Sequence, residues 1–315
     1  MMKQCYLGKK GYTIFKSELN KEEEQKILKD LTVKPFIPKS IIPATKFPVY
    51  RESTKKYYVP RFYGIEKYGN PKRVEISTGD KININFKGKL RDYQDNIVDK
   101  YVKYVDEIGG GLLEIDTGLG KTVIALNILT KIKVKALIIV HKEFLMNQWI
   151  ERIEQFIPEA RVGKIQGSKI DIEDKDIVIG MLQSISMKDY DTDVFNSFGI
   201  TVIDEVHHMG AEVFSQALYK VVTRYMLGLS ATMDRKDGLT PVFKMFIGPI
   251  VHTEKRKQEN NNVIVRRIDY KVDDEEFNEV KHNFRGDVCY SSMIGKLCTY
   301  NRRSEFIIKL IKSLF

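Results

Sequence analysis

The chain has 315 residues, of which 43% are hydrophobic and 30% charged, and it carries a formal net charge of +10 at pH 7. This composition excludes a disordered chain and predicts a globular protein of about two domains. No apolar run approaches the roughly 18 residues that span a bilayer, and the N-terminus lacks the apolar core of a signal peptide. Three cysteines are too few and too scattered for a disulfide framework or a zinc site. We therefore expect an intracellular protein with no membrane partner.

The first quarter of the chain is basic and rich in proline. Residues 1–80 contain 17 Lys and Arg against 9 Asp and Glu, and six of the nine prolines. A helix is predicted over residues 21–31, capped by Asn20. We interpret residues 1–88 as a small α+β accessory domain that could bind nucleic acid. The aromatic and basic side chains of residues 55–63 suit base stacking, but such residues are more often half core and half surface.

From Leu90 onward, short apolar runs alternate with segments of helical periodicity. Helices are predicted over residues 121–133 and 143–156. The apolar runs are uninterrupted, which is typical of strands covered on both faces. Their alternation with helices predicts an α/β fold with a doubly wound parallel sheet. Ligands of such sheets bind beyond the C-terminal ends of the strands. The predicted strands of this domain, residues 89–252, are 112–115, 136–140, 177–181, 200–204 and 226–229.

Residues 253–315 have a different character. The charged stretch 254–262 predicts a linker, the run 263–270 predicts a strand, and helical segments follow to the end of the sequence. One strand and some helix are too little for a second complete sheet. We therefore interpret this region as a linker and the incomplete start of another lobe.

The stretch LEIDTGLGKT, residues 113–122, predicts a phosphate-binding loop between a strand and a helix. Gly118 and Gly120 would let the backbone amides turn inward, and the helix N-terminus would add positive potential. Lys121 would reach the β and γ phosphates, and Thr122 would ligate Mg²⁺. The usual pattern asks for a glycine where Ile115 stands. Thr117 belongs to the same predicted nucleotide-binding loop.

Two adjacent acids follow the predicted strand 200–204 in the stretch ITVIDEVHH. Acids at the end of a buried strand are costly to desolvate unless they face a cation or a solvent-filled crevice. Asp204 would hold Mg²⁺ through water, and Glu205 would orient and deprotonate the attacking water. His207 would couple the γ-phosphate to neighbouring segments, whereas His208 is predicted to be structural.

Two further segments agree with a nucleotide site. The stretch LSAT ends another buried strand and would place Ser230 and Thr232 beside the acidic pair, where they couple it to the rest of the site. The stretch LRDYQ precedes the phosphate loop, and Gln94 there could read adenine through its paired donor and acceptor, with Arg91 beside it.

In this order and spacing, the stretches LRDYQ, TGLGKT, DEVHH and GLSATMDRKDG resemble the motor segments of superfamily 2 DExH-box helicases and translocases. The resemblance is strongest to the XPB-like branch, which includes the transcript-release helicases of poxviruses and other large DNA viruses. It implies a P-loop NTPase fold, with residues 89–252 as a first RecA-like lobe and residues 253–315 as the start of a second. In those families the phosphate loop lacks the first glycine, which accounts for Ile115.

The resemblance also implies a partner and the residues that contact it. The expected partner is nucleic acid, with duplex DNA favoured and RNA open, in viral transcription termination or remodelling together with transcription machinery. If the protein is viral, the expected compartment is the host cytoplasm, a viral factory or the virion. Gly167 could lie on the same face, and Trp149 is predicted to pack in the core. The implied contact residues are His141, Lys142, Gln183, Ser184 and Arg235.

One departure from the family leaves alternatives open. Complete motors have arginine fingers on a second lobe, worth about 10³–10⁵ in rate, and no such motif follows here. We expect a truncated form that binds ATP weakly, hydrolyses it slowly and cannot unwind processively. The alternatives are the motor subunit of a restriction-type complex, a non-enzymatic nucleic-acid or partner-binding module with structural nucleotide, and, more weakly, a GTP switch.

Overall fold

The structure is a computed structural model that describes residues 4–36, 44–191, 193–256 and 266–314. The chain divides into two compact units, residues 1–257 and 258–315, and each is described by itself. Among the described residues no helix has the length and apolar character needed to cross a membrane. Part of the predicted linker, residues 257–262, lies outside the described residues.

The first unit is built on an eight-stranded sheet in the order β11-β10-β12-β9-β13-β14-β8-β15. All neighbouring pairs are parallel except β10 and β11. The α/β parallel sheet that the sequence predicts is therefore confirmed. The strands are β8 (Gly110–Ile115), β9 (Ala136–Val140), β10 (Val162–Gln166), β11 (Lys169–Ile170), β12 (Ile177–Met181), β13 (Ile200–Ile203), β14 (Tyr225–Ser230) and β15 (Ile250–Glu254).

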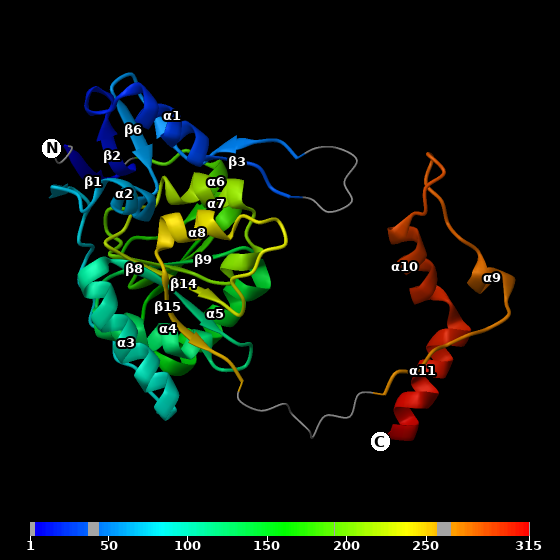
Figure 1. The fold of residues 1–315 in the computed structure, drawn as a ribbon. Helices are drawn as coiled ribbons and strands as arrows, with labels where there is room; N and C mark the ends of the chain where they lie inside the picture. Colours follow the sequence, from blue (N-terminus) through cyan, green and yellow to red (C-terminus); the bar gives the residue numbers. More distant parts are fainter. Residues whose placement is uncertain (1–3, 37–43, 192, 257–265, 315) are drawn as a thin grey trace. The chain divides into compact units, whose positions relative to one another are not determined.

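Helices cover both faces of this sheet and enclose one apolar core on each side. In Figure 1, α6, α7 and α8 lie between the sheet and the N-terminal elements, whereas α3 and α4 lie on the opposite side. The core on the side of α3 and α4 also contains residues of α5. The helices are α3 (Asp92–Ile108), α4 (Lys121–Ile132), α5 (Glu143–Phe156), α6 (Leu182–Met187), α7 (Ala211–Leu218) and α8 (Thr240–Ile247), with the 3-10 turn η2 (Val206–His208).

The N-terminal elements form a second sheet in the order β5-β6-β2-β1-β7. The predicted cap of the first helix is present, because Asn20 Oδ1 accepts a hydrogen bond from the Glu23 amide at 2.9 Å. The elements are β1 (Cys5–Gly8), β2 (Gly11–Phe15), η1 (Lys16–Glu18), α1 (Lys21–Asp30), β3 (Thr32–Val33), β4 (Phe47–Pro48), β5 (Arg51–Glu52), β6 (Lys56–Val59), α2 (Arg61–Tyr68) and β7 (Arg73–Val74).

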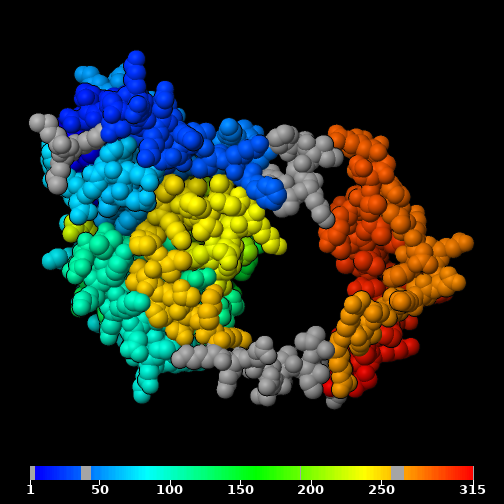
Figure 2. Space-filling model, viewed as in Figure 1, coloured from blue at the N-terminus to red at the C-terminus, as the bar shows by residue number. Residues whose placement is uncertain are grey.

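These elements pack directly on the main sheet's helices, as the contact of blue and yellow surfaces in Figure 2 shows. Arg61 donates to the carbonyl oxygens of Ile108 and Arg224 at 3.2 and 2.9 Å, and Tyr219 Oη donates to Val49 O at 3.0 Å. Two aromatic residues of the predicted base-stacking run, Tyr57 and Tyr63, are buried in the local core. Their rings are therefore not exposed for stacking on bases.

The second unit contains α9 (Glu275–Asn278), α10 (Tyr290–Thr299) and α11 (Asn301–Leu314). The strand predicted over residues 263–270 is wrong for residues 266–270, which form no strand, and residues 263–265 lie outside the described residues. Within residues 266–314 only Tyr300 is buried, whereas Phe284 is 91% exposed. Residues 266–314 therefore form no apolar core of their own.

The packing of α2 on β2 depends on a glycine. A Cβ at Gly64 would lie 2.2 Å from Tyr12 Cγ, whose ring is fully buried. We predict that Gly64→Ala lowers the free energy of unfolding of the first unit by about 1–3 kcal/mol, because the helix must move away from the sheet. Urea denaturation measures this. The matched control is Gly295→Ala in α10, where no atom lies within 4 Å; equal midpoints for both variants would contradict the prediction.

Candidate nucleotide site

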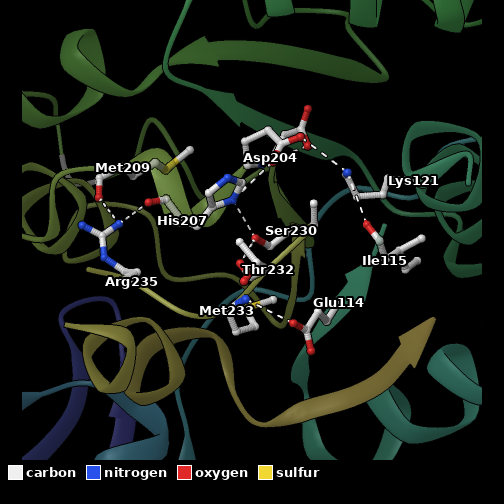
Figure 3. Close-up of polar contacts among 12 residues, drawn as sticks. Glu114, Ile115, Lys121, Asp204, His207, Met209, Ser230, Thr232, Met233 and Arg235 are labelled. Carbon is white, nitrogen blue, oxygen red and sulfur yellow. Dashed lines mark hydrogen bonds and ion pairs between the residues drawn. The ribbon is translucent and has the colours of Figure 1, made fainter. Parts of the chain in front are cut away.

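The predicted functional segments meet at one edge of the sheet. Each follows the C-terminal end of a parallel strand: the phosphate loop (residues 116–120) follows β8, the acidic pair follows β13, and Ser230 ends β14. Since β14 lies between β13 and β8, Ser230 stands between the acidic pair and the phosphate loop. Figure 3 shows these side chains around a common centre.

The phosphate loop has the backbone shape that an anion requires. Gly118 and Gly120 both have φ of +84°, in the left-handed region that favours glycine. The loop ends in the N-terminus of α4, whose first residue is Lys121 and whose N-cap, Gly120, makes no side-chain cap. The free amides at this helix end and the helix dipole together favour negative charge.

Lys121 points back over the loop toward the acidic pair. Its Nζ lies 3.3 Å from Ile115 O and 3.5 Å from Glu205 Oε1, and its side chain is only 10% exposed. The structure therefore brings together the predicted phosphate-binding lysine and the predicted catalytic carboxylate.

Asp204 is almost completely buried, with 6% of its surface exposed, and two hydrogen-bond donors hold its carboxylate. Its Oδ1 accepts from the Glu205 amide at 2.9 Å, and its Oδ2 accepts from Trp149 Nε1 at 2.8 Å. Burial raises the pKa of Asp204, and the Trp149 hydrogen bond opposes that rise. Trp149 packs in the core as the sequence predicts, but its polar contact gives it a further role.

Glu205 adopts a backbone conformation that is rare for its residue type. Its φ of +50° and ψ of +51° are left-handed, and such a residue costs about 1–3 kcal/mol unless its surroundings hold it there. Its Oε2 is buried without a hydrogen-bond partner among the described residues, although His207 Nδ1 lies 3.3 Å away. An unsatisfied buried carboxylate oxygen of this kind is a candidate ligand-facing atom.

His207 links the acidic pair to the end of β14. Ser230 Oγ donates its single hydrogen to Thr232 O, so the 2.7 Å contact between His207 Nδ1 and Ser230 Oγ has the histidine as donor. Burial lowers the pKa of His207, which favours the neutral ring with Nε2 as an acceptor. The Thr232 hydroxyl accepts from the Asp234 amide instead of contacting the acidic pair.

Arg235 has a different place from the nucleic-acid contact that the sequence predicts. Its Nη1 donates to His207 O and Met209 O at 2.6 and 2.8 Å, and its Nε and Nη2 donate to Asp237. The side chain is 10% exposed, and the guanidinium lies over the Phe243 ring. Figure 3 shows it holding the η2 turn. This arrangement supports a positioning role.

Gln94 braces the phosphate loop. Its Nε2 donates to Leu119 O at 3.1 Å, and its Oε1 accepts from the Arg91 amide at 3.0 Å. Tyr93 Oη also donates to Leu119 O, at 2.9 Å. Gln94 is 6% exposed, whereas Arg91 is exposed. The structure thus places Gln94 against the loop, whereas Arg91, among the described residues, contacts Gln94 and Tyr93 and not the loop itself, and the contact of Tyr93 with the loop had no sequence signal.

The residues predicted to contact nucleic acid lie next along the same edge, after β9 and β12. Lys142 and Gln183 are exposed, and Gln183 Nε2 lies 3.5 Å from His141 O. The Gly167 amide, in the turn after β10, donates to Ser184 Oγ of α6 at 2.9 Å, which places Gly167 beside this segment. The His141 ring packs beside that of His208, with centroids 5.6 Å apart.

Two basic residues that the sequence analysis did not single out follow β15 and reach the phosphate loop. Lys255 Nζ lies 3.4 Å from Asp116 Oδ1, and Arg256 Nη2 donates to Thr117 O at 3.2 Å. Their charge alone could not identify them, because they lie in the charged stretch 254–262, whose composition predicts a linker.

The donor set fits a magnesium-bound triphosphate. Thr122 supplies a hydroxyl, Asp204 supplies a carboxylate with a lone pair left on each oxygen, and both are hard oxygen ligands of the kind that Mg²⁺ prefers. Glu205 Oε2 is the buried oxygen that still needs a partner. Lys121 and the amides at the start of α4 supply the positive charge that phosphates require.

Comparison with known proteins gives consistent relatives. The family described as the res subunit of type III restriction enzymes matches residues 87–235. The chain is 36% identical over 314 residues to a putative ATP-dependent RNA helicase of Acanthamoeba polyphaga mimivirus, an alignment that covers 97% of this chain and 60% of that protein. It is 32% identical over 203 residues to the DNA 3'-5' translocase XPB2 of Sulfurisphaera tokodaii, covering 61% and 43%.

Among solved structures, the UvsW helicase of bacteriophage T4 aligns with a TM-score of 0.48 at 17% identity, over 73% of this chain and 93% of that chain. The chain spans about half the length of the mimivirus and Sulfurisphaera relatives, 60% and 43% respectively.

Replacing Arg235 with lysine removes the fork that holds the η2 turn. We predict that Arg235→Lys lowers the free energy of unfolding by about 1–3 kcal/mol, because one ammonium cannot reproduce four directed hydrogen bonds. Chemical denaturation checks this. Lys236→Ala at the exposed neighbouring position is the control and should stay within about 0.5 kcal/mol of the parent. If the two variants are equally stable, the Arg235 contacts do not hold the turn.

Proposed function

We propose that this chain is a superfamily 2 protein, related to viral proteins named as helicases and to an XPB translocase, that binds Mg²⁺ and ATP and supplies the ATPase site of a motor that moves along nucleic acid. The observation that carries the proposal is the 3.5 Å approach of Lys121 Nζ to Glu205 Oε1 across the phosphate loop.

Each charged residue of the site has a definable task in this proposal. Thr122 and Asp204 would hold the metal ion, which when bound neutralises negative charge on the phosphates. Lys121 exchanges its contact with Glu205 for the phosphate oxygens. Glu205 is then free to orient a water molecule and accept its proton. His207 carries the state of Glu205 to Ser230, because its Nδ1 lies within 3.3 Å of both side chains.

Hydrolysis is favoured over a purely structural use of nucleotide by the conformation of Glu205. A binding module has no need for a carboxylate held in a strained backbone with one oxygen unsatisfied. The alternative of a non-enzymatic module would leave this strain without a purpose.

We propose that the nucleic acid is duplex DNA and that the protein acts in viral transcription termination or remodelling, as the resemblance implies. The edge after β9 and β12 presents the exposed side chains of Lys142 and Gln183, which are of the kinds that contact phosphates and sugars. The names of the relatives differ in the nucleic acid, since one is named as an RNA helicase and another as a DNA translocase.

The activity proposed for the chain itself is ATP binding with slow hydrolysis. Because the chain spans about half of its relatives, processive movement is proposed only for a form that carries a second RecA-like lobe with arginine fingers. Adding such a lobe should raise nucleic-acid-stimulated turnover. Equal rates with and without it would contradict this part of the proposal.

Lys121→Ala tests nucleotide binding. We predict that it weakens ATP affinity about 10- to 100-fold, because a charge-assisted hydrogen bond to phosphate is lost. Isothermal titration calorimetry with Mg²⁺ and ATP measures it. Lys131→Ala, on the same helix, removes an exposed lysine paired with Asp99 and should leave the affinity unchanged. Loss of affinity in neither variant would disprove the proposed site.

Glu205→Gln separates binding from hydrolysis. We predict unchanged ATP affinity and a turnover at least about 10²-fold lower, because the glutamine side chain cannot accept the proton. Turnover is measured with duplex DNA and, separately, with duplex RNA; the proposal expects the larger stimulation from DNA. If turnover is measurable and equal in both proteins, Glu205 is not the base; if neither protein hydrolyses ATP, the chain is a binding module and not an ATPase.

A further inference from the structure

Trp149 is the only tryptophan of the chain and is almost completely buried, with 1% of its surface exposed. It lies on α5, far in sequence from the acidic pair, and its indole Nε1 donates to Asp204 Oδ2 at 2.8 Å. A buried indole N–H usually finds a hydrogen-bond acceptor. Here the acceptor is the carboxylate proposed to hold the metal ion.

The two hydrogen-bond donors to Asp204 come from different parts of the chain. The Glu205 amide contacts Oδ1 from the adjacent residue, and Trp149 contacts Oδ2 from α5. With one donor fixed on each oxygen, rotation of the carboxylate would break both hydrogen bonds. Each oxygen keeps one further lone pair for another ligand.

The indole itself cannot follow a moving carboxylate. Its ring belongs to the apolar core on the side of α4 and α5, together with Met146 and Ile153 from the same helix, both at most 1% exposed. Close packing of this kind resists side-chain displacement. The Nε1–H group is therefore a fixed point against which Asp204 is oriented.

We propose that Trp149 is a positioning residue for Asp204, whose indole N–H fixes the carboxylate orientation in which the metal ion of Mg²⁺–ATP is held. The inference rests on the proposed function. By this inference, a residue of α5 contributes to the affinity for the metal ion without itself contacting the nucleotide.

The test compares ATP affinity with Mg²⁺ and with EDTA, by calorimetry on the full chain. In Trp149→Phe the gain in affinity that Mg²⁺ gives should fall about 10-fold, because one charge-assisted hydrogen bond is lost, whereas affinity in EDTA stays within about twofold. Ile153→Val is the matched control, since it also removes buried volume from α5 but an isoleucine side chain donates no hydrogen bond to Asp204. Its Mg²⁺ dependence should equal that of the parent.

A second measurement needs no variant. Because Trp149 is the single tryptophan, the emission of the parent protein should change when Mg²⁺–ATP binds and change much less with ATP in EDTA at matched occupancy. The inference is overturned if Trp149→Phe keeps the full Mg²⁺ dependence, if Ile153→Val loses as much, or if emission does not distinguish the two conditions. Absence of ATP binding by the parent in either condition would instead defeat the proposed function.

Discussion

The parallel pairing of β13, β14 and β8 determines where every charged group of the site can lie. Ile203 stands opposite Gly228, and Ser230 stands opposite Glu114, so β13 ends two residues before β14 and the acidic pair that follows it comes level with the end of β14. A strand advances about 3.3 Å per residue and alternates its faces, so a slip of one residue would turn Ser230 to the other face. The hydrogen bond between Ser230 and His207 exists only in the observed register, and through it the acidic pair is tied to β14.

Within that frame, opposite charges make burial tolerable. Lys121 and Glu205 are 10% and 22% exposed and lie 3.5 Å apart, and Asp204 beside them is compensated by two hydrogen-bond donors. A buried charge without such compensation would be strongly destabilising. The same compensation keeps Glu205 in its left-handed conformation, since its neighbours hold both its backbone and its side chain. Strain stored in this way serves preorganisation, which is the usual reason for its presence at reactive sites.

The extent to which sequence predicts this structure follows from what each residue depends on. The strands 136–140 and 177–181 were predicted with correct bounds because each is an uninterrupted apolar run, which only a covered strand requires. The strand β15 was missed, because its half-exposed residues Ile250–Glu254 show no such run. The partner of the Trp149 indole could not be predicted, because it depends on how α5 packs against β9 and β12, beside which β13 carries Asp204. The contact of Arg235 with nucleic acid is implied only by the resemblance of its motif to the XPB-like branch, whereas the structure shows its hydrogen bonds to His207 O, Met209 O and Asp237.

The phosphate loop shows why a motif can lose a residue and keep its shape. Ile115 is a strand residue, paired with Glu254 of β15 and fully buried, so the chain has not yet turned where the usual pattern has glycine. The turn begins at Asp116, whose carboxylate accepts from the Arg256 amide, and ends at Leu119, whose carbonyl accepts from Tyr93 and Gln94. Both ends of the loop are thus held by residues outside the motif. These residues follow β15 or belong to α3. Because they hold the loop in place, left-handed backbone is needed only at Gly118 and Gly120. A buried isoleucine can therefore precede the loop without distorting it.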